Sequence, residues 1–529
     1  MMLVLEPAPV DAEHRVLPQQ PRVDRFPIGV VLASIVVSIG LRARFVTTPL
    51  SADEGGYLAV ARAWASGKLL YSEAWVDRPQ GLLVLFRVWD RLTGGSPVAI
   101  RVMAIVFGCV AVAAVAYTVF AIAGRRAAGV AAMLLAVASS NARIEGFIAN
   151  GELLAGAIGA VGVAAACGYL FRGRGLSWLF GAGVFAGCAV SLKQSGFDGF
   201  LAVLVFILAG GLVGERTWRR VTREFGICVA GFATVLAALL LHGMTLGFGS
   251  WWYALVGYRV GGLNASDADW HRFGITSRIA APTIAPLAIA AIAGLVIWLV
   301  RNRHLTRANF LVPAWVFFAV LAFLTGGLFH RHYWVTLTFP LAAAAAMAIA
   351  PRWHQPRRPH LLVAATCLLA VPSLISTEHV VVLGRAAAVI RAHDDPRLMI
   401  DEQVGKWYRV HRTPTSTLYA LCASAGVYAS ADAIPPYPYL WLDGVQHGKG
   451  SQQQLVELFA GDHPPTFVVV YQDASLCNPS GQVASLLQER YVPREVVDGV
   501  QILTLGGDFR ANGFGGDELS SRGSLRHVT

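Results

Sequence analysis

The sequence predicts a polytopic α-helical membrane protein with about 11 transmembrane helices, a cytoplasmic N-terminus and a small C-terminal α/β extracytoplasmic domain. Three observations lead to this fold class. Hydrophobic residues make up 55% of the 529-residue chain and charged residues only 14%, whereas soluble domains carry about 25% charged residues. Apolar runs of about 20 residues, long enough to cross a bilayer as helices, recur along the chain. After residue 377 the composition turns polar, and Pro- and Gly-rich turns separate short apolar segments.

The apolar runs predict a transmembrane domain over residues 27–377. We place its eleven candidate spans at 27–46, 97–123, 127–142, 152–171, 176–192, 197–213, 225–243, 280–300, 310–329, 335–350 and 360–377. The shorter runs can be kinked or tilted.

Arginine in the short connections between spans orients this domain. The connections 124–126, 172–175, 214–224, 301–307 and 351–359 hold fourteen arginines against two acids. Such loops are cytoplasmic under the positive-inside rule. The tail 1–26 is then cytoplasmic too, and we interpret the first span as an anchor because no cleavage-site pattern follows it. The net charge of +11 therefore reflects membrane topology and gives no reason to expect a nucleic-acid partner.

Eleven crossings put the residues after 378 outside. We expect an α/β domain over 378–510, with strand-like segments at 415–422 and 465–472 and a helix at 451–461. The polar, Gly- and Ser-rich segment 511–529 is predicted to be disordered. Cys422 and Cys477 both lie in this domain and can pair if it faces an oxidising compartment, a point the sequence leaves open.

An acid pair stands in the first external loop, residues 47–96. Asp53 and Glu54 follow the first span, and two amphipathic helical patterns come next, at 57–64 and 81–92. We expect both helices to lie on the membrane surface, with aromatic side chains at headgroup depth. A carboxylate there can act as a general base. The alternative is structural: Asp53 caps a helix and Glu54 favours its first-turn dipole, and the two roles are compatible.

The stretch 52–83, "ADEGGYLAVARAWASGKLLY…VDRPQGLL", resembles the first external loop of GT-C glycosyltransferases that use polyprenyl-phosphate sugars. That superfamily includes the protein O-mannosyltransferases and the lipid A aminoarabinose transferase. The matching features are the acid pair, a tyrosine, a Gly-to-Tyr turn and a basic residue before proline: Asp53, Glu54, Tyr57, Gly67 to Tyr71, and Arg78 with Pro79. Relatives often carry Lys-Pro-Pro where this chain has Arg78-Pro79-Gln80, which leaves the donor's identity open.

Further segments follow the same order. Glu152 resembles the acid at the outer end of the family's fourth span, and Lys193 resembles the lysine after its fifth. The late element "HRHYW", with Arg331, His332 and Tyr333, is similar to the family's R-x-Y…P motif. The segment 418–441 resembles a strand and tyrosine-rich turn of the family's soluble domain.

The resemblance implies an inverting transferase that acts on the periplasmic or extracellular face of a bacterial cell membrane. It implies that Asp53 is the general base and that Glu54 helps to position acceptor or sugar. It assigns donor-phosphate binding to Arg78, Lys193, Arg331 and His332, and substrate positioning to Tyr57, Glu152 and Tyr333. The implied partners are a polyprenyl-phosphate-linked sugar, membrane lipids and an envelope glycan, lipid or protein acceptor. No cofactor is required, but some relatives bind a divalent cation, and Asp77 is left as its candidate ligand.

Simpler interpretations stay open beside these roles. Arg78 and Lys193 can reach towards lipid headgroups, Glu152 can cap its helix, and residues 330–334 can form an interfacial belt. The function can also be that of a lipid-linked oligosaccharide ligase or polymerase. Outside the transferases, a transporter or flippase of lipid-linked sugars, or a non-catalytic assembly partner, is compatible with the same pattern.

Overall fold

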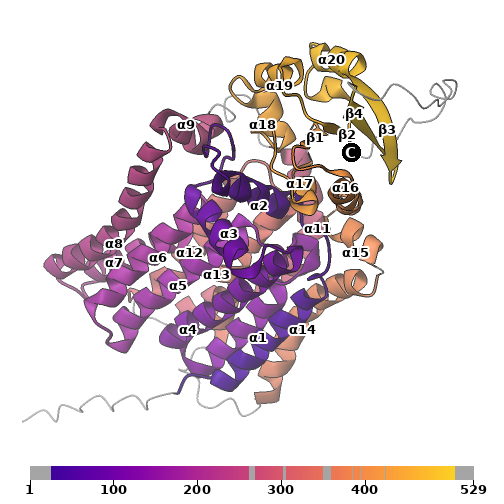
Figure 1. Ribbon diagram of the computed structural model, residues 1–529. Coiled ribbons are helices and arrows are strands. Elements are labelled where there is room, and N and C mark those ends of the chain that lie inside the picture. The colour runs from indigo at the N-terminus through magenta and orange to yellow at the C-terminus, as the bar shows by residue number, and fades with distance from the viewer. Residues whose placement is uncertain are drawn as a thin grey trace, which may run out of the picture.

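A helical bundle carries a smaller sheet-containing region at one of its ends (Figure 1). The computed structural model describes residues 25–260, 269–301, 306–349, 359–383, 385–393, 395–422 and 424–506. The tail 511–529 and nearly all of the tail 1–26 lie outside these residues.

The bundle helices coincide with the apolar runs. They are α1 (Ile28–Ala43), α4 (Pro97–Ala138), α5 (Gly151–Arg172), α6 (Leu176–Leu192), α7 (Asp198–Leu212), α8 (Trp218–Thr245), α11 (Trp270–Arg301), α12 (Ala308–Leu324), α13 (Trp334–Ala346) and α14 (Pro359–Val381). Short helical turns connect them: η1 (Ala142–Ile144), α9 (Phe248–Trp252), η2 (Tyr253–Gly257), η3 (Arg331–Tyr333) and η4 (Met347–Ile349). Four helices in the described residues, α4, α5, α8 and most of α11, are long and apolar enough to cross a membrane, and several shorter apolar helices accompany them.

Helix α4 holds two of the predicted spans, because the chain reverses at Gly124. This glycine has φ 81°, a conformation that residues with a Cβ rarely adopt. The guanidinium of Arg42 on α1 contacts Gly108 in the first half of α4 and also bonds to Ser139 and Ser140 just after its second half. The two halves therefore run antiparallel, as expected of spans at 97–123 and 127–142 joined by an arginine-containing turn.

Arg42 itself joins three segments at this end of the bundle. Its side chain is 1% exposed. Its Nε donates to the carbonyl oxygen of Gly146 at 2.9 Å, Nη2 donates to the carbonyl oxygen of Ser139 at 2.8 Å, and Nη1 donates to the hydroxyls of Ser38 and Ser140. A buried guanidinium needs hydrogen-bond acceptors in place of water, and all three nitrogens of Arg42 have one.

Helix α2 (Ala52–Ala65) corrects the expectation of a helix resting on the membrane surface. Tyr57, Val60 and Ala61 are at most 2% exposed, so the protein covers the side chains that were assigned to the headgroup region. Helix α17 (Ala425–Ala431) of the C-terminal region lies against α2 (Figure 1). The prediction of a surface helix was wrong here. Apolar side chains are favoured both at a bilayer interface and in a protein interior, so their pattern does not distinguish the two.

Helix α3 (Gln80–Thr93) keeps the expected amphipathic character. Leu82 and Phe86 are buried against the bundle. On its opposite side Val84, Val88 and Leu92 are exposed apolar residues, as in a helix at a lipid interface.

The C-terminal region wraps helices around a four-stranded sheet. Its helices are α15 (Arg385–His393), α16 (Arg397–His411), α17, α18 (Leu442–His447), α19 (Ser451–Ala460), η5 (Ala474–Leu476) and α20 (Gln482–Arg490); its strands are β1 (Leu418–Leu421), β2 (Phe467–Val470), β3 (Tyr491–Val497) and β4 (Val500–Leu505). The strand order is β1-β2-β4-β3, with β1 and β2 parallel and the other pairs antiparallel. The strands β1 and β2 and helix α19 lie in the three segments expected from the sequence, whereas β3 and β4 were not predicted.

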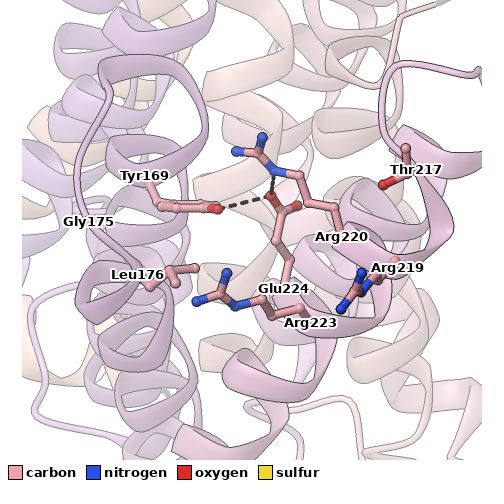
Figure 2. Close-up of a pocket in the computed structure, with 8 residues that line it drawn as sticks. All are labelled: Tyr169, Gly175, Leu176, Thr217, Arg219, Arg220, Arg223 and Glu224. Carbon is pink, nitrogen blue, oxygen red and sulfur yellow. Dashed lines mark hydrogen bonds and ion pairs between the residues drawn. The ribbon is translucent and has the colours of Figure 1, made fainter.

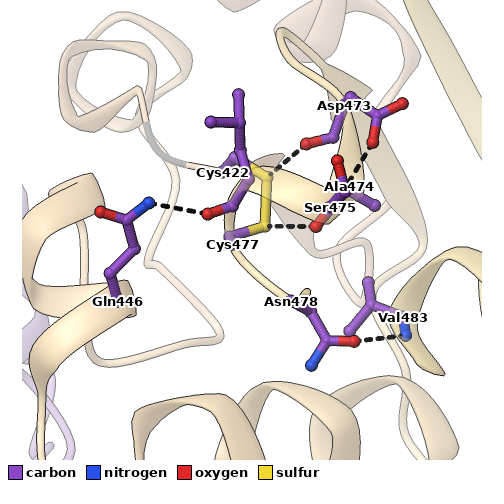
Figure 3. The surroundings of a disulfide bond; sticks show 9 residues. Cys422, Gln446, Asp473, Ala474, Ser475, Cys477, Asn478 and Val483 are labelled. Carbon is purple, nitrogen blue, oxygen red and sulfur yellow. Dashed lines mark hydrogen bonds between the residues drawn. A yellow bond between two sulfur atoms is a disulfide. The ribbon is translucent and has the colours of Figure 1, made fainter. Parts of the chain in front are cut away.

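A disulfide joins Cys422, directly after β1, to Cys477, directly after η5 (Figure 3). Beside it, the side-chain amide of Gln446 on α18 donates to the carbonyl oxygen of Leu476 at 2.8 Å. The pairing that the sequence left open therefore ties the loop before α20 to the first strand of the sheet.

The close approach of α2 and α17 generates a stability prediction. A Cβ on Gly55 would lie 2.7 Å from the Cα of Gly426, whereas a Cβ on Gly29 of α1 meets nothing within 4 Å. Alanine gains about 1 kcal/mol of helix propensity over glycine at either position. We expect Gly55→Ala to lower the free energy of unfolding by about 1–3 kcal/mol, because overpacking outweighs that gain.

Thermal unfolding of the purified protein in detergent measures this difference. Gly29→Ala is the matched control and should be neutral or stabilising. Equal melting temperatures for the two variants would contradict the described contact between α2 and α17.

Candidate active site

The candidate site lies at the end of the bundle that faces the C-terminal region. Five segments meet there: the first turn of α2, the loop around Asp77, the start of α5, the end of α6, and η3. They bring together most of the residues that the resemblance singled out.

The first turn of α2 is fixed by a capping box. Ser51 is the N-cap: its hydroxyl accepts from the backbone N–H of Glu54 at 3.2 Å, and the Glu54 carboxylate accepts from the backbone N–H of Ser51 at 3.0 Å. Asp53 is therefore not the cap, which corrects the structural alternative suggested for it. The Asp53 side chain does not serve as the N-cap of α2.

Glu54 has contacts inside the protein on both of its oxygens. It is fully buried. Besides the cap, Oε2 lies 2.8 Å from Nη1 of Arg101 on α4, and Oε1 accepts from the backbone N–H of Ala149 at 2.8 Å. The two acids of the pair thus lie in different environments, Glu54 inside and Asp53 with 22% of its side chain exposed.

His332 lies among three carboxylates. Its Nε2 is 3.7 Å from Asp53 Oδ2 and 3.8 Å from Glu152 Oε1, and its Nδ1 is 2.8 Å from Glu145 Oε2. Burial disfavours the charged imidazolium, but Glu152, Glu145 and Asp53 together outweigh burial and raise the pKa of His332 to about 9. His332 is then a cation at neutral pH.

Glu145 is a residue of this site that the sequence did not reveal. It follows η1 in the left-handed conformation, with φ 54°, and its two oxygens lie 2.8 Å from His332 Nδ1 and 2.9 Å from His393 Nδ1 of α15. Burial raises its pKa, but the two histidines lower it further, so the net shift is downwards. Its partners are 187 and 248 residues away in sequence, and no local pattern marks the contact.

Glu152 and Lys193 form an ion pair across the ends of α5 and α6. Asn150 is the N-cap of α5, with its side chain accepting from the Leu153 N–H at 2.9 Å, so the suggestion that Glu152 caps this helix is wrong. The Lys193 ammonium lies 4.2 Å from the ring centre of Tyr333, a cation–π distance. Lys193 is held inside the cluster, which also argues against a purely headgroup-directed side chain.

At one edge of the cluster two arginines, Arg78 and Arg259, flank Asp77. Arg78 Nη1 lies 2.8 Å from Asp77 Oδ1, while the other Asp77 oxygen is bonded to Arg259, which follows η2. The Arg78 side chain is only 11% exposed. Burial lowers its pKa, but the charge of the Asp77 carboxylate raises it by more. Arg78 is thus a buried, oriented cation, which does not fit the interpretation that it merely reaches towards headgroups.

Tyr57 and Arg331 lie at the margins of this arrangement. Tyr57 is 2% exposed and packs against Trp441 and Phe86. The pKa of Tyr57 is raised by burial first, and Asp53 is among the nearby charges that contribute. Arg331 donates to the carbonyl oxygens of Ala392 at 3.2 Å and Arg391 at 3.4 Å, at the end of α15. Its described contacts join η3 to α15.

The residues described by the structure offer no group of three His, Cys, Asp or Glu side chains with the geometry of a metal site. Asp77, the candidate ligand, has both oxygens occupied by guanidinium groups. Two arginines beside a carboxylate disfavour a further cation, so this donor set does not fit a divalent metal in the observed arrangement.

The raised pKa of His332 generates a pH prediction. Its folded-state pKa of about 9 exceeds the unfolded value of 6.5, so its stabilising contribution is complete below about pH 6.5 and is lost as the pH rises through 9. We expect wild type to lose roughly 2–3 kcal/mol of unfolding free energy relative to His332→Gln between pH 6 and pH 10.

Thermal unfolding of both proteins across this pH range provides the measurement. His447→Gln is the control, because His447 is exposed and its described ion pair is with Asp443, one helical turn away. A difference between wild type and His332→Gln that stays constant with pH would contradict the assignment.

Comparisons with known proteins show which solved structures share the fold of this chain. The sequence matches no family profile, and no curated protein matches it. Among solved structures, ArnT from Cupriavidus metallidurans, a lipid A aminoarabinose transferase, superposes with a TM-score of 0.62 at 12% identity, over 90% of this chain and 98% of ArnT. ArnT bound to undecaprenyl phosphate gives 0.61 at 12% identity, over 90% and 97% of the two chains.

The oligosaccharyltransferase AglB from Archaeoglobus fulgidus, in complex with an inhibitory peptide and a dolichol-phosphate, gives a TM-score of 0.54 at 12% identity. The match covers 92% of this chain and 75% of AglB. Both proteins are polyprenyl-phosphate-associated members of the GT-C superfamily. The chain therefore has the fold shared by ArnT and AglB.

Proposed function

We propose that the protein is a membrane glycosyltransferase that moves a sugar from a polyprenyl-phosphate donor to an envelope acceptor with inversion, and that Asp53 is its general base. One observation carries the proposal. Asp53 is a partly exposed carboxylate 3.7 Å from His332, at the edge of a cluster whose cations and other acids are largely buried. A base must meet an incoming hydroxyl or amine, while the leaving phosphate needs cations beside it.

In this mechanism the acceptor loses its proton to Asp53 as it attacks the anomeric carbon, and the bond between that carbon and the donor phosphate breaks. The charged His332, 3.7 Å away, orients the Asp53 carboxylate before the proton arrives. Glu54, with no exposed oxygen, acts as a positioning residue: its cap and its Arg101 pair hold the first turn of α2 in place.

Arg78 and Lys193 are the proposed partners of the donor phosphate, while His332 stays with the three acids around it, Asp53, Glu145 and Glu152. Arginine offers two parallel hydrogen bonds to a phosphate, and lysine a single point charge. We do not extend this role to Arg331, because its guanidinium bonds to the end of α15. Tyr333 and Glu152 hold Lys193 in place, and Tyr57 packs against Phe86 and Trp441 one helical turn after Asp53.

The sugar-bearing side is proposed to be extracytoplasmic. The disulfide between Cys422 and Cys477 lies in the region that covers the site, and disulfides persist in oxidising compartments. The arginine-rich loops 172–175 and 214–224 lie at the other end of α5, α6 and α8, which the positive-inside rule assigns to the cytoplasm.

A lipid-linked oligosaccharide ligase is the second candidate, favoured by the likeness to AglB, an oligosaccharyltransferase. The likeness to ArnT extends over nearly the whole of that protein, however, and over only 75% of AglB. This difference favours a donor that carries a single sugar. A transporter of lipid-linked sugars would have no need of a base at position 53.

Asp53→Asn tests the proposed base. Asparagine keeps the size of the side chain but cannot accept a proton, so we expect the transfer rate to fall by about 10²–10⁴, with the melting temperature almost unchanged. The measurement is mass spectrometry of envelope glycolipids and glycoproteins from a deletion strain that carries the variant, compared with wild type.

Asp90→Asn is the matched control. Asp90 has the same 22% exposure as Asp53, lies on the neighbouring helix α3 and forms an ion pair with Arg62 away from the cluster. It should retain the modification. A wild-type glycan in the Asp53→Asn strain would refute the base and favour transport.

The proposed sidedness has its own test in intact cells. We expect a membrane-impermeant maleimide to label Gln488→Cys, an exposed position on α20 of the C-terminal region, in intact cells, with wild type as the unlabelled reference. A single cysteine introduced by Arg125→Cys, beside the exposed turn at Gly124, should react only after the cells are permeabilised. Labelling of Arg125→Cys in intact cells would overturn the orientation.

A further inference from the structure

A cationic pocket lies at the end of the bundle far from the candidate active site (Figure 2). It has a volume of about 780 Å³ and lies between the end of α5, the start of α6 and the start of α8. Three arginines on the first two turns of α8 line it, Arg219, Arg220 and Arg223, with Glu224 and Tyr169. Three arginines against one glutamate leave the lining with a surplus of two positive charges.

Glu224 organises this pocket without neutralising it. The Glu224 side chain is 1% exposed, and its Oε1 accepts from the Tyr169 hydroxyl at 2.9 Å and from Arg220 Nε at 3.0 Å. The bond through Nε leaves the two terminal nitrogens of Arg220 directed away from Glu224 (Figure 2). The Arg219 and Arg223 side chains are exposed and have no carboxylate among the described contacts.

The pocket is separate from the proposed donor-phosphate site. Glu152 stands at the first turn of α5 and Tyr169 near its last turn, about 25 Å apart at 1.5 Å per residue. A phosphate at Arg78 and Lys193 therefore cannot reach these arginines.

The surroundings of the pocket indicate an occupant that belongs to the membrane. Trp178, near the start of α6, and Trp218, at the start of α8, are exposed, and Arg174 lies over the Trp178 ring at 5.2 Å. Exposed tryptophans mark headgroup depth. Beyond the pocket, the next turns of α8 carry apolar side chains that are partly or fully exposed, Ile227, Val229, Ala230 and Ala233, which suits contact with acyl chains. A soluble anion would gain nothing from this apolar side.

We propose that the pocket binds the phosphate headgroup of an anionic phospholipid from the leaflet at this end of the bundle. The arginines bind the phosphate oxygens, the Thr217 hydroxyl at the pocket wall supplies a neutral donor, and the acyl chains lie along α8. Pockets of 300–1,000 Å³ suit small-molecule groups of this size, and basic pockets between membrane helices bind anionic headgroups.

Native mass spectrometry of the detergent-purified full-length protein tests this site, with phosphatidylglycerol and phosphatidylcholine as the added lipids. We expect wild type to retain phosphatidylglycerol in preference to phosphatidylcholine. Arg219→Gln/Arg223→Gln should weaken phosphatidylglycerol binding about thirtyfold, on the scale of two arginines near an anionic surface. Both residues are exposed, so the fold should persist, and an unchanged melting temperature verifies this.

Arg125→Gln/Arg126→Gln is the matched control, because these exposed arginines lie in the turn at Gly124 and do not line the pocket. It should bind phosphatidylglycerol as wild type does. Equal loss in both double variants, or equal retention of the two lipids by wild type, would overturn the proposal. Displacement of the lipid by millimolar inorganic phosphate would show a site for free phosphate instead.

Discussion

The buried pair of Glu54 and Arg101 is the contact on which the arrangement of the candidate site depends. Arg101 is 1% exposed and Glu54 fully buried, and their charged atoms are 2.8 Å apart. Around this pair Arg101 also donates to the carbonyl oxygen of Pro49, and Glu54 also accepts from Ser51 and Ala149. One ion pair therefore joins the end of the loop after α1, the start of α2, helix α4 and the residues before α5. Removing one partner from such a pair leaves the other charge buried, which costs about 3–5 kcal/mol.

This anchor explains why two adjacent acids have different environments. Successive helical residues point about 100° apart, so fixing Glu54 inwards turns Asp53 towards the cluster. Asp53 then faces His332, which reaches Glu145 and through it His393 of α15. The loop 47–96, η3 and the C-terminal region thus meet in one network, although their residues lie far apart in sequence.

The sequence predicted what depends on local pattern and missed what depends on distant partners. Hydropathy located the bundle helices to within a few residues, except where α8 and α11 begin earlier, and the arginine-containing turn at Gly124 was anticipated as a loop. The predicted surface position of α2 was wrong because Tyr57 and Val60 are covered by a second layer of protein, formed by the C-terminal region. No local sequence pattern indicates this layer. The cap at Ser51 was not predicted, although its signal is local: Ser-x-x-Glu at 51–54 is the signature of a capping box. Glu145 could not have been found, since its two histidines follow it by 187 and 248 residues.

The buried ion pairs determine what the proposed donor phosphate must replace when it binds. Arg78 and Lys193 each have a carboxylate partner in the structure, and a phosphate that takes either cation must not strand that carboxylate without charge compensation. The structure supplies a second cation in both cases. Asp77 is also bonded to Arg259, and Glu152 Oε1 also lies 3.8 Å from His332 Nε2. A donor phosphate can therefore replace Asp77 at Arg78 and Glu152 at Lys193 while each acid keeps a cation. This redundancy keeps both cations oriented when no donor is bound, and it lowers the electrostatic cost of releasing them when a donor binds.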